Sequence, residues 1–206
     1  MTNRHSSFSS AFITSILALL LPVGGTAAVM EEVVVTAQKR EQNIQDVGIA
    51  ITAYTGDQLN ELGISDPDQL DAMVPGLMVT DFGMTTTTVM TLRGSTQLDF
   101  ADHQEPPVAV YIDGAYNSYI GGVGQSFYDI DRVEVLKGPQ GTLFGRNATG
   151  GLVHLITNKP TQETEGYVQA TAGEFHLQRI EGAISGSLSE SLSARVSVLI
   201  DQDDGY

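Results

Sequence analysis

The sequence predicts a small α/β domain with a mixed sheet, followed by the first antiparallel strands of an incomplete transmembrane β-barrel. Over residues 46–160, β-prone runs alternate with capped helical segments, which is typical of a mixed α/β unit. After Pro160 the pattern changes to long strands in which apolar and polar residues alternate. A strand at 132–137 leads into a block of glycines, which predicts a tightly folded loop because glycine accepts positive φ angles and close approach.

Residues 1–28 are predicted to be a secretory signal peptide. Basic residues precede an apolar run at 11–24, which is shorter than the about 20 residues that a spanning helix needs. Small residues at 26–28 are typical of a signal-peptidase site, so the mature chain would begin near Val29. The alternative is a buried helix in a cytosolic protein, but the order of charge, apolar run and small residues favours the signal peptide.

A β-prone segment follows this site directly, within residues 29–45. Three consecutive valines and a threonine favour extended structure, and a polar stretch at 38–43 follows them. A short strand on a polar, flexible tether is suited to pairing with the edge of a sheet in another protein, where main-chain hydrogen bonds supply the affinity. The alternative is an ordinary first strand of the domain. The residues of the predicted pairing segment are Glu32, Val33, Val34, Val35, Thr36 and Ala37.

The domain at 46–160 is predicted to begin with a strand at 47–53. Two short helices follow at 55–63 and 66–73, because both segments carry capping residues and end at glycine or at a Pro-Gly pair. Five further strands are predicted at 77–80, 88–93, 108–112, 132–137 and 152–157.

Three polar, glycine-rich loops connect these strands, at 81–87, 94–107 and 115–125. Recognition residues concentrate on loops that a rigid scaffold positions. A tyrosine in such a loop can stack on a ligand and still donate a hydrogen bond through its hydroxyl group. We therefore expect the ligand contacts of this domain to lie in the loops.

Composition and motifs argue against several classes of function. The formal net charge of −15 argues against nucleic acid as a partner, because phosphate binding needs clustered Lys and Arg. The chain has no cysteine, so it has neither a disulfide framework nor a thiolate metal site. The glycine block lacks the spacing of a P-loop, the dinucleotide fingerprint is incomplete, and no catalytic motif is found. We expect neither an enzyme nor a resident metal or cofactor.

Residues 161–206 are predicted to form the first three strands of a barrel. In the strand at 192–201, one face carries Leu, Ala, Val, Val and Ile, and the other carries Ser, Arg, Ser, Leu and Asp. A second strand is predicted at 180–188 and a weaker one at 168–172. Alternating strands of about 10 residues cross outer membranes, although a soluble antiparallel sheet has the same alternation. Three strands cannot close a barrel, and lipid does not tolerate the open edges that would remain, so these strands are only the beginning of a barrel.

Four motifs in this order make the chain similar to the TonB-dependent outer-membrane receptors of Gram-negative bacteria over residues 31–206. They are Glu32–Ala37, Thr91–Gly94, Val110–Gly114 and the glycine block at 132–151. The resemblance implies that residues 46–160 are an α/β plug domain, that the pairing segment is the TonB box, and that the protein lies in the cell outer membrane. It also implies three partners: TonB with its ExbB–ExbD motor, membrane lipid through the barrel, and an extracellular ligand such as an iron chelate.

The resemblance assigns roles to two groups of residues. The apical loops of such a plug face the outside, which implies ligand contacts at Gln97, His103, Tyr116, Asn117 and Tyr119. A second group would belong to the charges that hold the plug against the inner barrel wall: Arg93, Glu134 and Arg146. Three alternatives stay open here, namely a solvated loop position for His103, packing of Tyr119 against the barrel, and salt bridges within the domain for the charged group.

The function that the resemblance implies is active import, in which TonB pairs with the TonB box of a loaded receptor and pulls the plug aside. The ligand class stays open among ferric siderophores, haem, cobalamin and oligosaccharides. The position of the box directly after the predicted cleavage site argues against an additional N-terminal signalling domain. Because three strands form no pore, this chain alone would not transport. The alternative is an isolated plug-like periplasmic binding module or a nonfunctional truncation.

Overall fold

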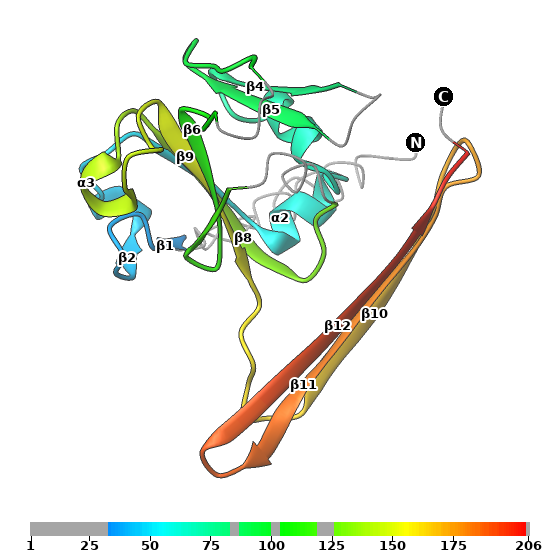
Figure 1. The fold of residues 1–206 in the computed structure, drawn as a ribbon. Helices are drawn as coiled ribbons and strands as arrows, with labels where there is room; N and C mark the ends of the chain where they lie inside the picture. The colour runs from blue at the N-terminus through cyan, green and yellow to red at the C-terminus, as the bar shows by residue number, and fades with distance from the viewer. Residues whose placement is uncertain (1–32, 83–86, 100–103, 119–125, 205–206) are drawn as a thin grey trace, which may run out of the picture. The chain divides into compact units, whose positions relative to one another are not determined.

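The structure is a computed structural model that describes residues 33–82, 87–99, 104–118 and 126–204. These residues form a five-stranded mixed sheet, two two-stranded sheets and one three-stranded antiparallel sheet (Figure 1). The predicted fold class, a small mixed α/β domain followed by antiparallel strands, is thus confirmed. Among the described residues no helix has both the length and the apolar character needed to cross a membrane.

The five-stranded sheet is the scaffold of the domain. Its strand order is β3-β8-β9-β6-β7, in which β6 and β9 are parallel and every other neighbouring pair is antiparallel. The turn from β6 to β7 contains Asp113 and Gly114, both with positive φ, as the tight hairpin turn of an Asp-Gly pair requires. The strands are β3 (Ile51–Thr55), β6 (Val108–Ile112), β7 (Ala115–Asn117), β8 (Ile130–Lys137) and β9 (Gly151–Thr157).

Three small elements precede this sheet. They are β1 (Val34–Val35), β2 (Gln42–Asn43), which pairs with it in antiparallel fashion, and the 3₁₀ turn η2 (Ile44–Asp46). The Asn43 side chain caps that turn, because its oxygen accepts a hydrogen bond from the backbone N–H of Gln45 at 2.8 Å. The strand predicted at 47–53 begins only at Ile51, after this turn and a short irregular stretch.

Two short helices follow β3, as predicted. α2 (Gly56–Glu61) begins at a capping box in which the Thr55 hydroxyl accepts from the Gln58 backbone N–H at 3.2 Å and the Gln58 side chain accepts from the Thr55 N–H at 3.1 Å. The second element, η3 (Pro67–Ala72), is a 3₁₀ helix and not an α-helix. Six residues is long for a 3₁₀ helix, since runs beyond about 3–4 residues are uncommon.

Hydrophobic side chains cover both faces of the five-stranded sheet. The first core cluster joins one face to α2, η3 and the hairpin of β4 (Leu77–Asp81) and β5 (Thr88–Leu92), and it includes Leu59, Leu70, Val79, Met90, Val133 and Val153. The second core cluster lies on the opposite face, since side chains alternate along a strand. Its buried members are Val35, Ala37, Ala109, Tyr111, Leu136, Phe144, Ala148 and Leu152.

The glycine block between β8 and β9 folds into a compact loop that contains one short helix, α3 (Gly141–Phe144). Gly151 ends this loop with a φ of +146°. A Cβ atom at this position would lie 2.4 Å from the carbonyl oxygen of Leu136, which is closer than real Cβ contacts. Only glycine therefore fits where the chain enters β9.

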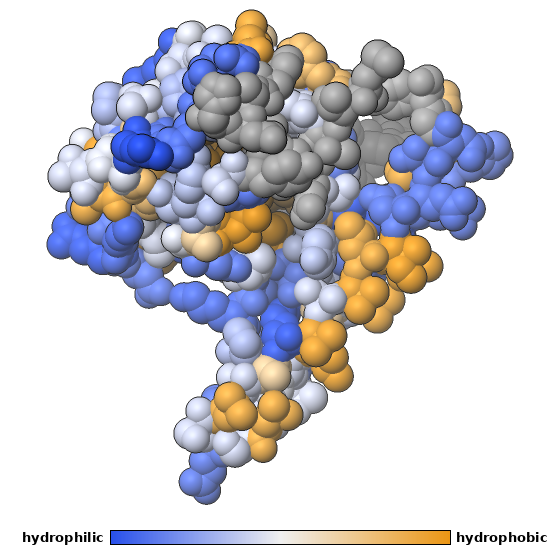
Figure 2. Space-filling view, viewed as in Figure 1, coloured by the Kyte–Doolittle hydropathy of each residue, from blue (hydrophilic) through white to orange (hydrophobic). Residues whose placement is uncertain are grey.

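The last three strands form an antiparallel sheet in the order β10-β11-β12. They are β10 (Glu165–Ala172), β11 (Gln178–Ser189) and β12 (Leu192–Gln202). We call one side the apolar face; it exposes Val168, Ile180, Ile184, Val196, Val198 and Ile200. Figure 2 shows hydrophobic side chains gathered along these strands. On the opposite face the buried side chains belong to the central strand β11; they are Arg179, Glu181, Ala183 and Ser185.

Candidate functional site

The predicted pairing segment is docked on the domain. Val35 and Ala37 are 0% and 1% exposed, and both belong to the second core cluster. The neighbouring Val34 side chain, in contrast, is 41% exposed. After β1 the chain turns, and the Lys39 ammonium group lies 5.4 Å from the centroid of the Phe144 ring, which is a cation–π contact. The stretch expected to be a flexible tether is therefore paired back onto β1 through β2.

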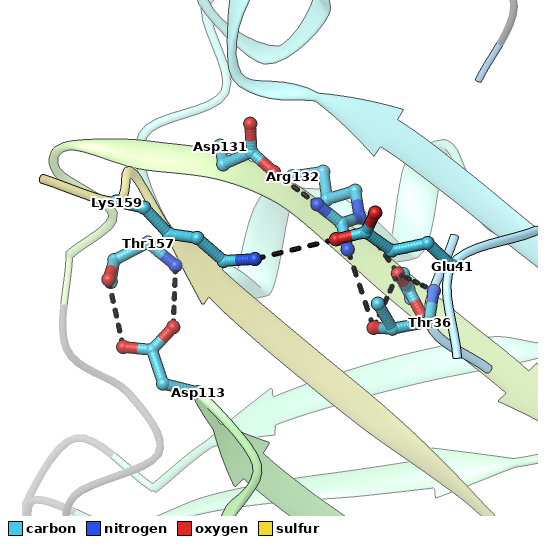
Figure 3. A network of polar contacts seen from close by, with 8 residues as sticks. Thr36, Glu41, Asp113, Asp131, Arg132, Thr157 and Lys159 are labelled. Atoms are coloured by element: carbon cyan, nitrogen blue, oxygen red, sulfur yellow. Dashed lines mark hydrogen bonds and ion pairs between the residues drawn. The ribbon is translucent and has the colours of Figure 1, made fainter. Parts of the chain in front are cut away.

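Thr36 connects this segment to two charged residues of β8 (Figure 3). Its backbone N–H donates to Glu134 Oε1 at 2.7 Å, and its hydroxyl donates to the same oxygen at 3.1 Å. Arg132 Nε donates to that oxygen at 2.8 Å, and Arg132 Nη2 lies 3.4 Å from the Thr36 hydroxyl oxygen. Glu134 is 0% exposed, so its negative charge depends on these buried donors.

Glu134 belongs to a row of polar side chains that crosses this face of the sheet. In the strand register Glu134 lies opposite His154, and His154 lies opposite Tyr111. His154 is 7% exposed, and its Nε2 accepts a hydrogen bond from the backbone N–H of Gly114 at 3.0 Å. The neutral ring therefore carries its proton on Nδ1. Burial lowers the pKa of His154 and outweighs the opposing effect of the Glu134 charge.

Two atoms of this row have no hydrogen-bond partner within the described part of the chain. They are Glu134 Oε2, an acceptor, and His154 Nδ1, a donor in the neutral tautomer. Among the described residues there is also no group of three or more His, Asp or Glu side chains placed to hold a metal ion. The chemistry available here is the binding of a strand through a buried carboxylate.

The structure describes three of the five predicted ligand contacts. The Gln97 side chain donates to Gln104 Oε1 at 3.3 Å within the loop that follows β5. Tyr116 and Asn117 lie in β7, so the loop predicted at 115–125 begins with a strand. The Tyr116 ring is 5.6 Å from the Tyr111 ring and packs against the second core cluster, and burial raises its pKa. A ligand-binding role for these residues stays a prediction.

Several predicted positions lie outside the described residues. They are His103 and Tyr119 among the ligand contacts, Glu32 of the pairing segment, and the signal peptide at 1–28.

The charged residues predicted to face a barrel wall have contacts within the domain. Arg146 Nη2 forms an exposed ion pair with Glu105 Oε1 at 2.9 Å. Glu134 is bound by Arg132 and Thr36, as described above. Arg93 is exposed, has a φ of +51°, and donates its backbone N–H to the carbonyl of Gly76 at 2.7 Å. The partners of Arg146 and Glu134 match the alternative of intradomain bonds, and pairing of all three with a wall stays a prediction.

The structure reveals an ionic site that sequence reasoning missed, between the domain and the last three strands. Arg195 of β12 binds Asp129 through one edge of its guanidinium group, in a bidentate pair with Nε to Oδ2 at 2.8 Å and Nη2 to Oδ1 at 2.5 Å. Asp129 is 5% exposed, and its backbone N–H donates to Glu181 of β11 at 2.9 Å. Burial alone would raise the pKa of Asp129, but hydrogen bonds from Arg195 and Asn158 outweigh burial and hold the pKa below its ordinary value.

Comparison with known proteins agrees with this architecture. The family model of the TonB-dependent receptor plug domain matches residues 43–152, which is more than half of the chain. The pesticin receptor of Yersinia pestis is 29% identical over 91% of this chain and 28% of its own length. The ferripyoverdine receptor of Pseudomonas aeruginosa is 30% identical over 83% of this chain and 20% of its own length. The chain thus spans about a quarter of the length of these curated relatives.

Solved structures give the same result. The ferric yersiniabactin uptake receptor FyuA of Yersinia pestis superimposes with a TM-score of 0.67 and 29% identity, over 73% of this chain and 24% of that chain. FpvA of Pseudomonas aeruginosa, solved with bound pyoverdines, superimposes with a TM-score of 0.69 and 25% identity, over 82% of this chain and 22% of that chain. The iron-regulated outer membrane virulence protein of Vibrio cholerae is also similar, at 29% identity over 81% of this chain and 27% of its own length, in agreement with the outer-membrane location expected for this chain. The sequence motifs, the mixed sheet and these matches together show that the chain belongs to the plug-domain family of TonB-dependent receptors.

Proposed function

We propose that this chain is the plug-bearing part of a receptor that imports a ferric siderophore across the outer membrane. Support for the ligand class comes from the relatives, which include a ferric yersiniabactin uptake receptor and a ferripyoverdine receptor. A vitamin B12 transporter of Photobacterium profundum is a more distant relative at 25% identity. Cobalamin is therefore the second ligand to test, followed by haem and oligosaccharides.

The observation that carries the proposal is the docked pairing segment. The segment is held by its ladder with β2, by the buried side chains of Val35 and Ala37, and by the carboxylate of Glu134. These contacts are few enough for the segment to leave the domain without unfolding the five-stranded sheet, in which it takes no part. TonB, driven by ExbB–ExbD, would pair with the released strand and pull on the plug.

The last three strands support a role in a membrane wall. Their apolar face would contact lipid, and the opposite face binds the domain through Arg195 and Glu181. Within the described residues the β10-β11-β12 sheet has two open edges, and lipid does not tolerate unpaired edges. These residues alone would therefore form no pore, and transport requires further strands.

Uptake experiments on the receptor that carries this sequence test the proposal. Removal of residues 32–37 should abolish uptake of an iron-55-labelled ferric siderophore, while binding of the same siderophore to whole cells should stay nearly unchanged. A large loss of affinity would contradict the proposal, because the segment would then be part of the ligand site. Growth under iron limitation with ferric siderophores, compared with growth on haem or cobalamin, would identify the ligand class.

A further inference from the structure

The hydrogen-bond pattern of β1 defines an inner edge and an outer edge. The backbone N–H of Ile44 donates to the carbonyl of Val33 at 3.0 Å, so Val33 and Ile44 form a hydrogen-bonded pair of the antiparallel ladder. Such pairs alternate along two strands, and Val35 with Gln42 is the next one. The backbone groups of Val34 and the N–H of Thr36 therefore point away from β2, toward the outer edge, while the Thr36 carbonyl accepts from the Lys39 N–H at 2.8 Å in the turn.

The outer edge of β1 is where a partner strand would add while β1 stays paired with β2. Strand addition needs free backbone N–H and C=O groups on one edge. The Thr36 N–H is one of these groups, and Glu134 Oε1 already accepts its hydrogen bond at 2.7 Å. A carbonyl of an incoming strand would have to displace this carboxylate.

Resting on the proposed function, we propose that Glu134, oriented by Arg132, caps the outer edge of β1 and keeps the docked segment from pairing with a strand of TonB. Glu134 is thus a positioning residue of the pairing segment. Its Oε1 atom accepts from the Thr36 N–H, the Thr36 hydroxyl and Arg132 Nε. Charge-assisted hydrogen bonds of this kind are stronger than neutral ones, so a neutral peptide carbonyl competes poorly for the same N–H.

The geometry favours this cap over contact between Glu134 and a barrel wall. Glu134 is 0% exposed, and β1 shares the second core cluster on its face of the sheet. A wall residue could approach the carboxylate only after β1 leaves. Arg132 contacts both Glu134 and the Thr36 hydroxyl oxygen, so the three side chains form one closed set of contacts around the edge.

A single thiol provides the readout for the test. The chain has no cysteine, so Val35→Cys introduces one reporter at a position that is 0% exposed in the docked state. The thiol is smaller than the valine side chain and fits the same space. The rate of its reaction with a maleimide, measured on the whole chain in detergent micelles at one fixed pH, reports how often β1 opens. Binding of the purified periplasmic domain of TonB is measured on the same samples without ligand.

In this background, E134Q keeps the shape of the side chain but removes its charge. A hydrogen bond to a charged group contributes about 1.5–3 kcal/mol, so labelling should become about ten- to hundred-fold faster, with a similar gain in TonB binding. Adding Val34→Pro should remove the gain in TonB binding but not the faster labelling, because this N–H faces the outer edge. Glu105→Gln is the matched control; it breaks an exposed ion pair elsewhere and should change neither readout.

The outcomes separate the cap from the proposed function. Unchanged labelling and unchanged TonB binding in E134Q would overturn the cap. Faster labelling without TonB binding in any variant would support the cap and overturn TonB as the partner. If E134Q fails to fold, Thr36→Val replaces it, because this variant removes only the hydroxyl contacts with Glu134 and Arg132 and leaves no charge unpaired. It should accelerate labelling by a smaller factor, and no acceleration would overturn the cap.

Discussion

His154 and Glu134 place an ionisable pair at the centre of the five-stranded sheet. The two residues lie opposite each other on β8 and β9, and both are almost completely buried. Glu134 accepts hydrogen bonds from Arg132 and Thr36, whereas His154 accepts one from a backbone N–H, and burial lowers the pKa of the His154 ring. Protonation of the buried His154 ring is therefore unfavourable in the folded domain.

We predict that the domain loses stability as pH falls below about 6.5, the ordinary pKa of histidine. Burial lowers the pKa of His154 in the folded state, and Arg132 acts in the same direction, while Glu134 and Asp113 oppose it. The unfolded chain therefore binds the proton first. Stability is complete above about pH 6.5 and is lost as pH falls toward the lower folded pKa, at up to about 1.4 kcal/mol per pH unit for one proton. Denaturant unfolding followed by circular dichroism between pH 7.5 and 5 measures this loss.

The matched variant is His154→Gln, which can accept from the Gly114 N–H but does not titrate in this range. Its stability should be nearly independent of pH between 7.5 and 5. An equal pH dependence in both proteins would assign the loss to other groups. Asp129, whose pKa is held below its ordinary value, acts at more acid pH and does not interfere.

A second prediction concerns the buried ion pair of Asp129 and Arg195. Replacement of Arg195 by Ala leaves a carboxylate that is 5% exposed without its main partner, so the free energy of unfolding should fall by about 3–5 kcal/mol. The double variant with Asp129→Asn should recover part of this loss, because it removes the uncompensated charge. A double-mutant cycle in detergent micelles measures the coupling. Additive losses in the two single variants would mean that the pair contributes no coupling.

The candidate site shows which residues sequence reasoning can find. Glu134 was named only through the family resemblance, as a contact of the plug with the barrel wall. Its contact with Thr36 spans 98 positions along the chain, and the contact of Arg195 with Asp129 spans 66, so local patterns contain no signal for either. His154 lies in a strand whose other residues are mostly apolar, and only the pairing of β8 with β9 brings it opposite Glu134.

At the scale of the element, the backbone conformation at Gly151, where the glycine block passes into β9, requires glycine. We predict that Gly151→Ala lowers the free energy of unfolding by about 1–3 kcal/mol or more, since the backbone is strained for any side chain and a Cβ atom would meet the Leu136 carbonyl oxygen. Gly48→Ala is the control, because no atom lies within 4 Å of its added Cβ and its φ is not positive. Chemical denaturation of both variants checks the difference. Equal stabilities would show that the β8–β9 junction relaxes freely.

Elements with strong local signals were predictable, and their pairing was not. The capping box at Thr55 and Gln58 gave the start of α2, and the alternation of residues gave β4, β5 and β12 nearly to the residue. The strand predicted at 47–53 starts late because Asn43 caps a 3₁₀ turn, a side-chain contact that competes with extended structure. The parallel pairing of β6 with β9 joins segments far apart in sequence, and no local pattern specifies it.

At the scale of the whole molecule, the two faces of the β10–β12 sheet should respond differently to charge. We predict that Val196→Arg, on the apolar face, weakens association of the chain with phospholipid vesicles by about 2–4 kcal/mol near the bilayer midplane. Ser193→Arg, on the other face, should have a much smaller effect. Vesicle flotation at several lipid concentrations measures both. Equal losses would mean that the apolar face does not contact lipid.

The overall fold class was predictable because the chain contains two kinds of sequence pattern, one on each side of residue 160. Mixed helix and strand signals up to residue 160 specify a compact domain, and regular alternation beyond it specifies an exposed sheet. The contact between Arg195 of this sheet and Asp129 could not be predicted from the sequence. Polar residues on the inner face of a strand show the same alternation whatever they contact.

The short hairpin of β1 and β2 also determines how the chain yields to tension. Its open end holds both Val33 and Ile44, so a pull on the N-terminal side against the domain loads the ladder at that end. The hydrogen bonds between β1 and β2 then break in sequence from that end, and not simultaneously. Asp129, which directly precedes β8, and Arg195 of β12 take no part in this ladder, so their ion pair is still intact when the hairpin has opened. The hairpin therefore yields to tension at its N-terminal end without a load on the Asp129–Arg195 ion pair.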